Sequence, residues 1–178
     1  MYEKNLDHEI LKLIEGHPEI SEKDIAHNLS VPEELVKTRI ANLNDTREKI
    51  LIMGNGRSFH EKLKMELEAE NYSVVKAPGS YSILEAVKNE KPDLILVDTG
   101  LADIYGFEIC KQLKASFRYW WIPVMILSEK GGDRNRIEAF ESGADDYLAM
   151  PLNSPELKAR VRMILRRNRT LSEGKSGN

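Results

Sequence analysis

Hydrophobic positions along the chain follow two patterns that meet near residue 46. Before this point they recur at helical spacing, and no strand pattern is present. After it, short and almost entirely apolar runs alternate with segments of helical periodicity. The apolar runs predict five strands, which are KILIM (49–53), YSVVKA (72–77), DLILVD (93–98), IPVMILS (122–128) and DDYLAM (145–150). The change of pattern predicts two domains, residues 1–46 and 47–170, and a small polar tail, residues 171–178, that we expect to be disordered.

Strands that are apolar on both faces need cover on both faces, which indicates a parallel sheet between two layers of helices. The strands alternate with five helices, one of which we expect to begin with a capping box at Ser58. Right-handed crossovers and the length of this region favour a doubly wound, flavodoxin-like α/β fold with strand order 2-1-3-4-5. Functional residues gather at the carboxyl ends of the strands in such a sheet. Four places therefore draw attention, namely Gly54-Asn55-Gly56, Asp98, Ser128 and Ala149-Met150-Pro151.

The turn Gly54-Asn55-Gly56 follows a buried strand and precedes a helix, and it has two interpretations. A glycine turn at this place can cradle a phosphate group. However, Phe59 stands where a dinucleotide-binding G-x-G-x-x-G motif would have its third glycine, and no G-K-[ST] follows. The other interpretation is that the turn is the remainder of a site that once held something else.

Three segments of the second domain carry a family resemblance, namely DLILVDTGLADIYGFEICKQLK, IPVMILSEK and ESGADDYLAMPLNSPELKARV. They resemble the receiver domain of bacterial response regulators, and the likeness covers residues 49–167. The resemblance implies that Asp98 is the phosphoacceptor position and that Ser128 is the residue that senses phosphate. It also implies that Tyr147 is the switch aromatic residue and that Pro151 follows the position of the family's lysine.

The chain departs from the receiver pattern at the positions that bind Mg²⁺ and stabilise charge during phosphoryl transfer. Gly54-Asn55 stands where receivers carry the acidic pair that holds Mg²⁺, and Met150 replaces the lysine. Mg²⁺ needs an oxygen shell anchored by carboxylates, and phosphoryl transfer depends on positioning and charge stabilisation. We therefore predict that Asp98 is not used as a phosphoacceptor and that no metal or cofactor is bound. The predicted degenerate pocket consists of Gly54, Asn55, Ser128, Tyr147 and Met150.

The first 46 residues predict three short helices, the last of which we expect to begin with a capping box at Ser30. Two helices joined by a tight turn are typical of a helix-turn-helix. The segment DHEILKLIEGHPEISEKDIAHNLSVPEELVKTRIANL resembles the helix-turn-helix of the leucine-responsive and asparagine regulator family. In such a domain the reader helix presents its first residues to base edges and its cations to phosphates. The DNA-binding candidates are then Lys37, Thr38 and Arg39.

The last helix and the loop before the fourth strand each allow two interpretations. Lys158, Arg162, Arg166 and Arg169 follow helical spacing. They form either a solvated basic face or, because receivers commonly pair through this helix, the face of a homodimer. The opposite charges in such a dimer would come from Glu141, Asp145 and Asp146. Trp120-Trp121 is either an exposed docking patch or a pair divided between the core and an edge.

Composition narrows the class of protein. The chain has 178 residues, a net charge of −3 and a single cysteine, so it has no internal disulfide and suits a reducing compartment. No apolar run approaches membrane-spanning length and the first residues are too charged for a secretion signal, so we expect a soluble, cytoplasmic protein. The four histidines show no metal-ligand spacing, and no nucleophile–base pair is present, which argues against a metal site and against an enzyme.

The charge of the first domain does not decide whether its partner is DNA or protein. Residues 1–46 contain ten acidic and five basic side chains, a net charge of −5. Because contacts between cations and phosphates dominate affinity for DNA, this charge argues against DNA binding by the first domain alone. Two hypotheses remain. The first is a phosphorylation-independent response regulator in prokaryotic signal transduction that regulates transcription through its helix-turn-helix. The second is an adaptor whose two domains bind protein partners and not DNA. The pairing of the two folds favours the first, and the acidic reader helix favours the second.

Overall fold

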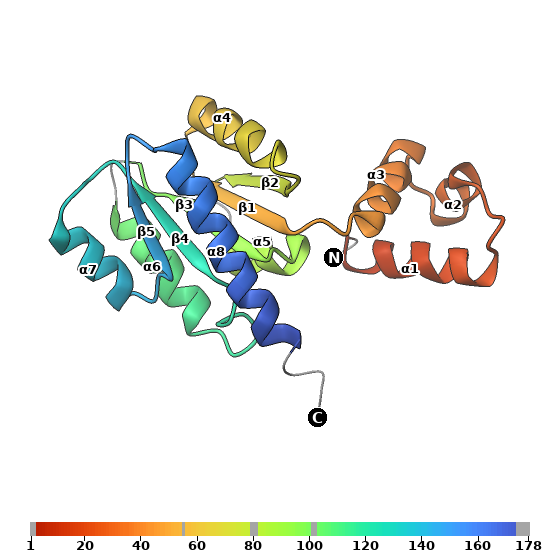
Figure 1. Ribbon diagram of the computed structural model, residues 1–178. Coiled ribbons are helices and arrows are strands. Elements are labelled where there is room, and N and C mark those ends of the chain that lie inside the picture. The colour runs from red at the N-terminus through yellow and green to blue at the C-terminus, as the bar shows by residue number, and fades with distance from the viewer. Residues whose placement is uncertain (1–2, 55, 79–81, 101–102, 174–178) are drawn as a thin grey trace. The chain divides into compact units, whose positions relative to one another are not determined.

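The computed structural model describes residues 3–54, 56–78, 82–100 and 103–173 (Figure 1). The chain divides into two compact units, residues 1–46 and residues 47–178. Within the described ranges, no helix combines the length and the apolar character that crossing a bilayer requires.

The first unit consists of three helices, α1 (Glu3–Gly16), α2 (Glu22–Leu29) and α3 (Glu33–Asn44). They enclose a small core of Leu6, Ile10, Ile25, Ala26 and Val36. The expected capping box at Ser30 is wrong. Ser30 ends α2 in the left-handed conformation, with a φ of 54°, whereas an N-cap residue needs extended backbone. The residue that precedes α3 is Pro32.

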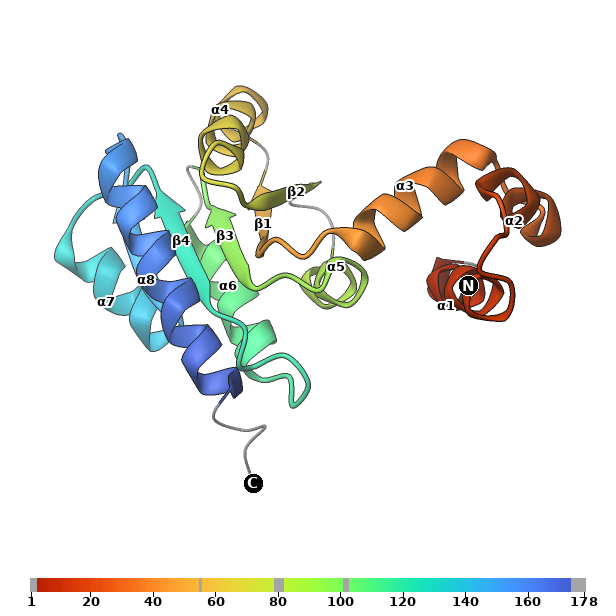
Figure 2. The same cartoon turned by 45° about the vertical axis from the view of Figure 1, so that its right-hand side comes forward.

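The second unit is built on a five-stranded parallel sheet with strand order β2-β1-β3-β4-β5, which confirms the predicted topology (Figure 1). Figure 2 shows the strands β2, β1, β3 and β4 of this sheet from another side. The strands are β1 (Lys49–Gly54), β2 (Ser73–Pro78), β3 (Leu94–Asp98), β4 (Val124–Ser128) and β5 (Asp146–Ala149). Met53 pairs with Val97, and Asp98 pairs with Leu127. The carboxyl ends of the three central strands are therefore level, which brings Gly54, Asp98 and Ser128 to one edge.

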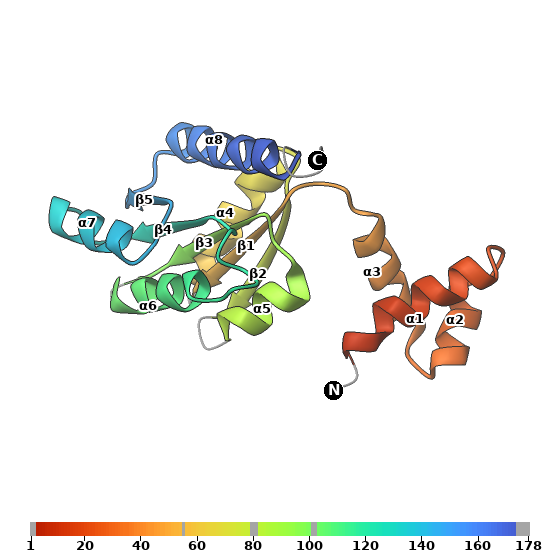
Figure 3. The same cartoon turned by 90° about the horizontal axis from the view of Figure 1, so that it is seen from below.

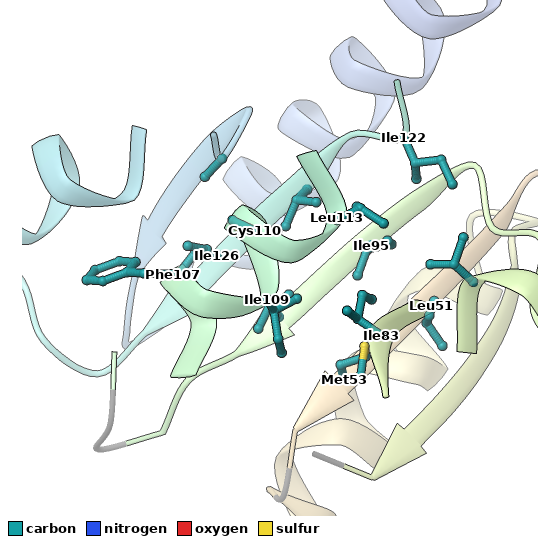
Figure 4. Close-up of a cluster of buried hydrophobic side chains, with 14 of the residues drawn as sticks. Leu51, Met53, Ile83, Ile95, Phe107, Ile109, Cys110, Leu113, Ile122 and Ile126 are labelled. Atoms are coloured by element: carbon teal, nitrogen blue, oxygen red, sulfur yellow. The ribbon is translucent and has the colours of Figure 1, made fainter. Parts of the chain in front are cut away.

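Helices cover both faces of the sheet (Figure 3). They are α4 (Arg57–Glu68), α5 (Ile83–Glu90), α6 (Asp103–Lys114), α7 (Asp133–Glu141) and α8 (Ser154–Glu173). One face packs against α4 and α8 through Leu63, Leu67, Leu157, Val161, Ile164 and Leu165. The other packs against α5, α6 and α7, and its cluster includes Cys110 (Figure 4). Burial raises the pKa of the Cys110 thiol to about 12, so the thiolate that reacts with oxidants is scarce at neutral pH.

Two helix boundaries of the second unit also differ from the expectation. The helix α4 begins at Arg57 with Gly56 as its N-cap, not at Ser58, and the N–H of His60 donates to the carbonyl of Gly56 at 2.8 Å. This places His60 in the first turn. The helix α8 continues to Glu173, so the expected disordered tail is wrong for residues 171–173, and residues 174–178 lie outside the described residues. No glycine or proline interrupts the helix between Glu156 and Glu173.

Candidate functional site

The centre of the site is a pair that joins the end of β3 to the first turn of α4. His60 Nε2–H donates to Asp98 Oδ2 at 2.8 Å. Both residues are buried, with 4% of His60 and 6% of Asp98 exposed. The second oxygen, Asp98 Oδ1, accepts the N–H of Gly100 at 2.9 Å. Each oxygen of the carboxylate at the predicted phosphoacceptor position therefore already has a partner from the same chain.

The glycines of the turn after β1 make room for this pair. A Cβ atom at Gly56 would lie 2.6 Å from Asp98 Oδ2 and 3.5 Å from His60 Nε2. A Cβ atom at Gly54 would lie 2.7 Å from the backbone oxygen of Asp98, 2.9 Å from its Cβ and 3.1 Å from His60 Cε1. Side chains at either position would need the space that the carboxylate and the imidazole occupy. The absence of side chains on both sides of residue 55 thus suits the His60–Asp98 contact.

The electrostatic balance keeps Asp98 ionised. Burial raises the pKa of the Asp98 carboxyl, because it disfavours the charged form. The hydrogen bonds from His60 and from the Gly100 N–H, together with the charge of the imidazole ring, lower the pKa and outweigh burial. The net pKa lies below its usual value. The pair is consequently a carboxylate that accepts two hydrogen bonds in a site with little solvent.

Ser128 and Tyr147 meet at the backbone of Lys130. The N–H of Lys130 donates to Ser128 Oγ at 3.0 Å. The hydroxyl of Tyr147, which is buried, donates to the carbonyl oxygen of Lys130. The residues that the resemblance predicts to be the phosphate sensor and the switch aromatic thus both contact the loop after β4.

Met150 takes part in an apolar hollow instead of an ionic site. A hollow of about 540 Å³ between α4 and the segment after β5 is lined by Phe59, Lys62, Leu63, Glu66, Glu129, Met150, Pro151, Leu152 and Ser154. Phe59, Met150 and Leu152 also pack against the core on this face of the sheet. The thioether side chain is thus placed for packing.

The described residues do not fit Mg²⁺. The ion requires near-octahedral oxygen ligands and is usually anchored by carboxylates. Among the described residues, the Asp98 carboxylate accepts from an imidazole and a backbone N–H, and Gly56 lies beside its Oδ2 oxygen. Across the ranges that the structure describes, no three histidine, cysteine or acidic side chains are grouped to hold a metal. The predicted pocket residue Asn55 lies outside the described residues.

His60 is the functional residue that sequence reasoning missed. The four histidines show no metal-ligand spacing, and a lone histidine in an amphipathic helix gives no other signal in the pattern of residues. A usable signal was present in its position. His60 lies four residues after Gly56, within the first turn of the helix that leaves the functional edge of the sheet.

The DNA-binding candidates lie together on α3 and have acidic neighbours. Lys37 Nζ lies 2.9 Å from Glu33 Oε1 and 3.3 Å from Glu34 Oε1. The Thr38 hydroxyl donates to the carbonyl of Glu34 at 2.8 Å, and Arg39 Nε lies 3.8 Å from a carboxylate oxygen on α1. Lys37 and Thr38 are exposed.

The basic residues of α8 contact carboxylates of the same chain. Lys158 and Arg162 lie 3.0 Å and 3.5 Å from Glu70, and Arg169 lies 3.1 Å from Glu48. Two of the three acidic residues expected to face a second copy also have partners within the chain. Asp145 contacts Lys114 at 2.9 Å, and Asp146 contacts Arg160 at 2.9 Å.

The family model of the response regulator receiver domain matches residues 50–162. The chain is 36% identical over 121 residues to the alkaline phosphatase synthesis transcriptional regulatory protein PhoP of Bacillus subtilis, covering 68% of this chain and 50% of that protein. It is 35% identical over 119 residues to the DNA-binding dual master transcriptional regulator RpaA of Synechocystis, covering 67% of this chain and 49% of that protein. The chain spans about half the length of these relatives.

Solved structures show the same relationship. A putative response regulator from Chloroflexus aurantiacus superposes with a TM-score of 0.62 at 30% identity, over 68% of this chain and 99% of that one. A two-component response regulator from Clostridium difficile superposes with a TM-score of 0.58 at 34% identity, over 68% of this chain and 98% of that one.

Proposed function

The chain belongs to the response regulator receiver family, and we propose that it is a phosphorylation-independent member that regulates transcription through an N-terminal helix-turn-helix. The observation that carries the first part is the buried contact between His60 Nε2 and Asp98 Oδ2. The second part is supported by the three helices of residues 1–46 and by relatives that are transcriptional regulators.

The His60–Asp98 contact opposes phosphorylation in two ways. A carboxylate oxygen attacks a phosphoryl group with a lone pair, and here each oxygen already accepts a hydrogen bond, one from His60 and one from Gly100, which makes both oxygens weaker nucleophiles. The phosphoryl group would also add roughly −1.5 to −2 charges to a buried site. Its charge would have to be balanced, and neither Gly54 nor Met150 offers a carboxylate for Mg²⁺ or an ammonium. The imidazole instead occupies the Oδ2 oxygen of the carboxylate through a hydrogen bond at 2.8 Å.

Acetyl phosphate with Mg²⁺ is expected to leave the protein unmodified, because positioning and charge stabilisation supply most of the catalysis in phosphoryl transfer. Intact-mass spectrometry measures the result, with a receiver that has the complete acidic pair and lysine as the positive control. A stoichiometric phosphoryl adduct that disappears in Asp98→Asn would refute phosphorylation independence and leave the proposed DNA binding untouched.

Binding of duplex DNA is expected to depend on Lys37 and Arg39 and to be weak, because Glu33 and Glu34 compete for Lys37. Removing two phosphate contacts lowers the slope of log affinity against log salt by about 1.8. Titration of genomic DNA fragments over a salt series tests this with Lys37→Ala/Arg39→Ala, and Lys12→Ala, at an exposed position on α1, serves as the control. Unchanged binding by the double variant would contradict the assignment.

One observation favours the adaptor as a second candidate function. The net charge of −5 on residues 1–46 suits a cationic protein surface better than DNA. Pairing of two chains through α8 stays a prediction. Because Asp145 and Asp146 already contact cations of their own chain, a second copy would have to offer other carboxylates.

A further inference from the structure

We propose that the second unit carries its own binding site for single-stranded nucleic acid, formed by the outward face of α8 and the aromatic loop between α6 and β4. This inference goes beyond the proposed function, because it concerns neither the His60–Asp98 pair nor the helix-turn-helix. The α8 face consists of Lys158, Arg162, Met163, Arg166, Arg167 and Arg169. The aromatic loop consists of Phe117, Trp120 and Trp121.

The α8 face is hollowed and cationic. A hollow of about 650 Å³ is lined by Arg162, Met163, Arg166 and Arg169 of α8, with Ala159, Glu48 and Tyr72 completing its wall. The guanidinium groups of Arg162 and Arg169 stand at its border, where their side chains are 61% and 63% exposed. Guanidinium groups bind phosphate in a planar, bidentate geometry that an ammonium does not offer. A groove with guanidinium groups along it therefore suits a phosphate backbone.

The carboxylates on this face leave an excess of positive charge. Four cations of α8 contact three carboxylates, since Lys158 and Arg162 share Glu70, Arg167 contacts Asp145 and Arg169 contacts Glu48. Ion pairs between exposed groups contribute only about 0–1 kcal/mol each, so a strand of phosphates can displace them. The charge of the unit agrees with this excess, since the chain carries −3 and residues 1–46 carry −5, which leaves +2 for residues 47–178.

Exposed aromatic side chains of the aromatic loop extend the surface of the α8 face. Phe117 is 94% exposed, Trp120 is 53% exposed and Trp121 is 47% exposed. Trp121 and Arg167 line one small hollow of about 70 Å³ together with Met163, which also lines the larger hollow. The loop is held in place by Lys114, whose Nζ donates to the carbonyls of Trp120 at 3.1 Å and Ile122 at 2.9 Å. The aromatic loop and the α8 face are thus one continuous surface.

Single-stranded nucleic acid is the partner that uses both components. A cationic groove follows the backbone of the strand, and aromatic side chains stack on unpaired bases. An acidic protein would use the arginines alone, and paired bases of a duplex are not free to stack on Phe117 or Trp120. A second copy of the chain would bring the same excess of positive charge to the contact. An anionic membrane would suit the aromatic residues, but it would not fill a groove between Tyr72 and Arg166.

Tryptophan fluorescence offers a direct test, because the only two tryptophans of the chain are Trp120 and Trp121. Titration of the full chain with oligomers of thymidylate or uridylate of about 20 nucleotides should quench this fluorescence, and the affinity should fall as salt rises. In Arg162→Glu/Arg166→Glu the affinity should fall at least tenfold and the salt slope by about 1.4, since each contact to a single strand contributes about 0.7. Phe117→Ala should weaken binding about fivefold or more through lost stacking.

Two matched variants separate this site from other effects. Arg134→Glu/Arg136→Glu makes the same change of charge at exposed positions on α7, and it should bind the oligomers as the wild type does. Lys37→Ala/Arg39→Ala should also bind them normally while losing any duplex binding, which distinguishes this site from the helix-turn-helix. Equal weakening by the α7 variant would overturn the proposal, because it would show unspecific attraction. Equal quenching by polyglutamate, or binding only to vesicles of anionic lipid, would overturn it as well. So would dimerisation in light scattering that the α8 variant abolishes, if no oligomer binds.

Discussion

Replacing His60 with leucine is expected to lower the free energy of unfolding by about 3–5 kcal/mol. The substitution leaves the Asp98 carboxylate buried with its Oδ2 oxygen unpartnered, and such a charge costs far more to bury than a neutral group. Urea unfolding followed by tryptophan fluorescence measures the change in the second unit, because both tryptophans lie there. The variant His60→Leu/Asp98→Leu should recover much of the loss, since apolar residues often replace a buried ion pair without penalty. A loss below about 1 kcal/mol in His60→Leu would show that the contact is not a buried ion pair.

The loss of stability in His60→Leu is expected to depend on pH. The pKa of Asp98 is lowered in the folded wild type, so its carboxylate contributes stability above the unfolded pKa near 3.9 and loses it as pH falls through the folded pKa. Without His60, burial of Asp98 favours the protonated carboxyl. Acid therefore raises the free energy of unfolding of the variant, whereas it does not raise that of the wild type. The difference between the two proteins should therefore be largest above about pH 5 and should shrink below about pH 4. A difference that is constant with pH would point to lost packing instead of lost charge pairing.

Gly54→Ala is expected to destabilise the protein by about 2–5 kcal/mol, from strain and overpacking together. The φ of Gly54 is 149°, which side chains rarely adopt, and a Cβ atom would lie 2.7 Å from the backbone oxygen of Asp98. That oxygen belongs to β3 and cannot move without disturbing the sheet. Gly131→Ala is the matched control, because nothing lies within 4 Å of its Cβ position. Thermal and urea unfolding of the two variants should differ clearly, and equal stability would contradict the crowding at Gly54.

Gly54→Asp extends this experiment to the metal. The substitution places an acidic residue where the resemblance to receivers predicts one, but it brings the same Cβ atom into the same crowded place. Millimolar Mg²⁺ is therefore expected to leave the thermal midpoint of Gly54→Asp unchanged, since a ligand stabilises only a folded site that it occupies. A clear rise in the midpoint would show that one carboxylate is enough to rebuild the metal site.

The sheet could be predicted because its strands are buried on both faces. Runs such as LILV after Asp93 admit few other structures, and parallel order follows from the alternation with helices. The meeting of Gly54, Asp98 and Ser128 at the carboxyl ends of neighbouring strands could then be predicted from the topology. The His60–Asp98 contact could not be predicted in this way. It depends on how closely the first turn of α4 approaches β3, and the glycines that permit this approach looked only like lost ligands.

Contacts between residues distant in sequence account for other features that could not be predicted. The spacing of Lys158, Arg162 and Arg169 on one helix face could be read from the chain. Their partners Glu70 and Glu48 could not, because they lie about ninety residues or more earlier. The end of α8 was misjudged because a polar composition after Arg169 resembles a tail, although helix continues through residues 171–173.

The contact of Tyr147 and Ser128 with Lys130 bears on how long a response would last. A receiver that carries an acyl phosphate contains a timer, since the signal ends when that bond hydrolyses. With His60 on Asp98, and Tyr147 and Ser128 both joined to the backbone of Lys130, the proposed function leaves this protein without such a timer. The strength and duration of its effect would then follow its abundance, so that synthesis and proteolysis of the chain become the steps at which a cell sets the response.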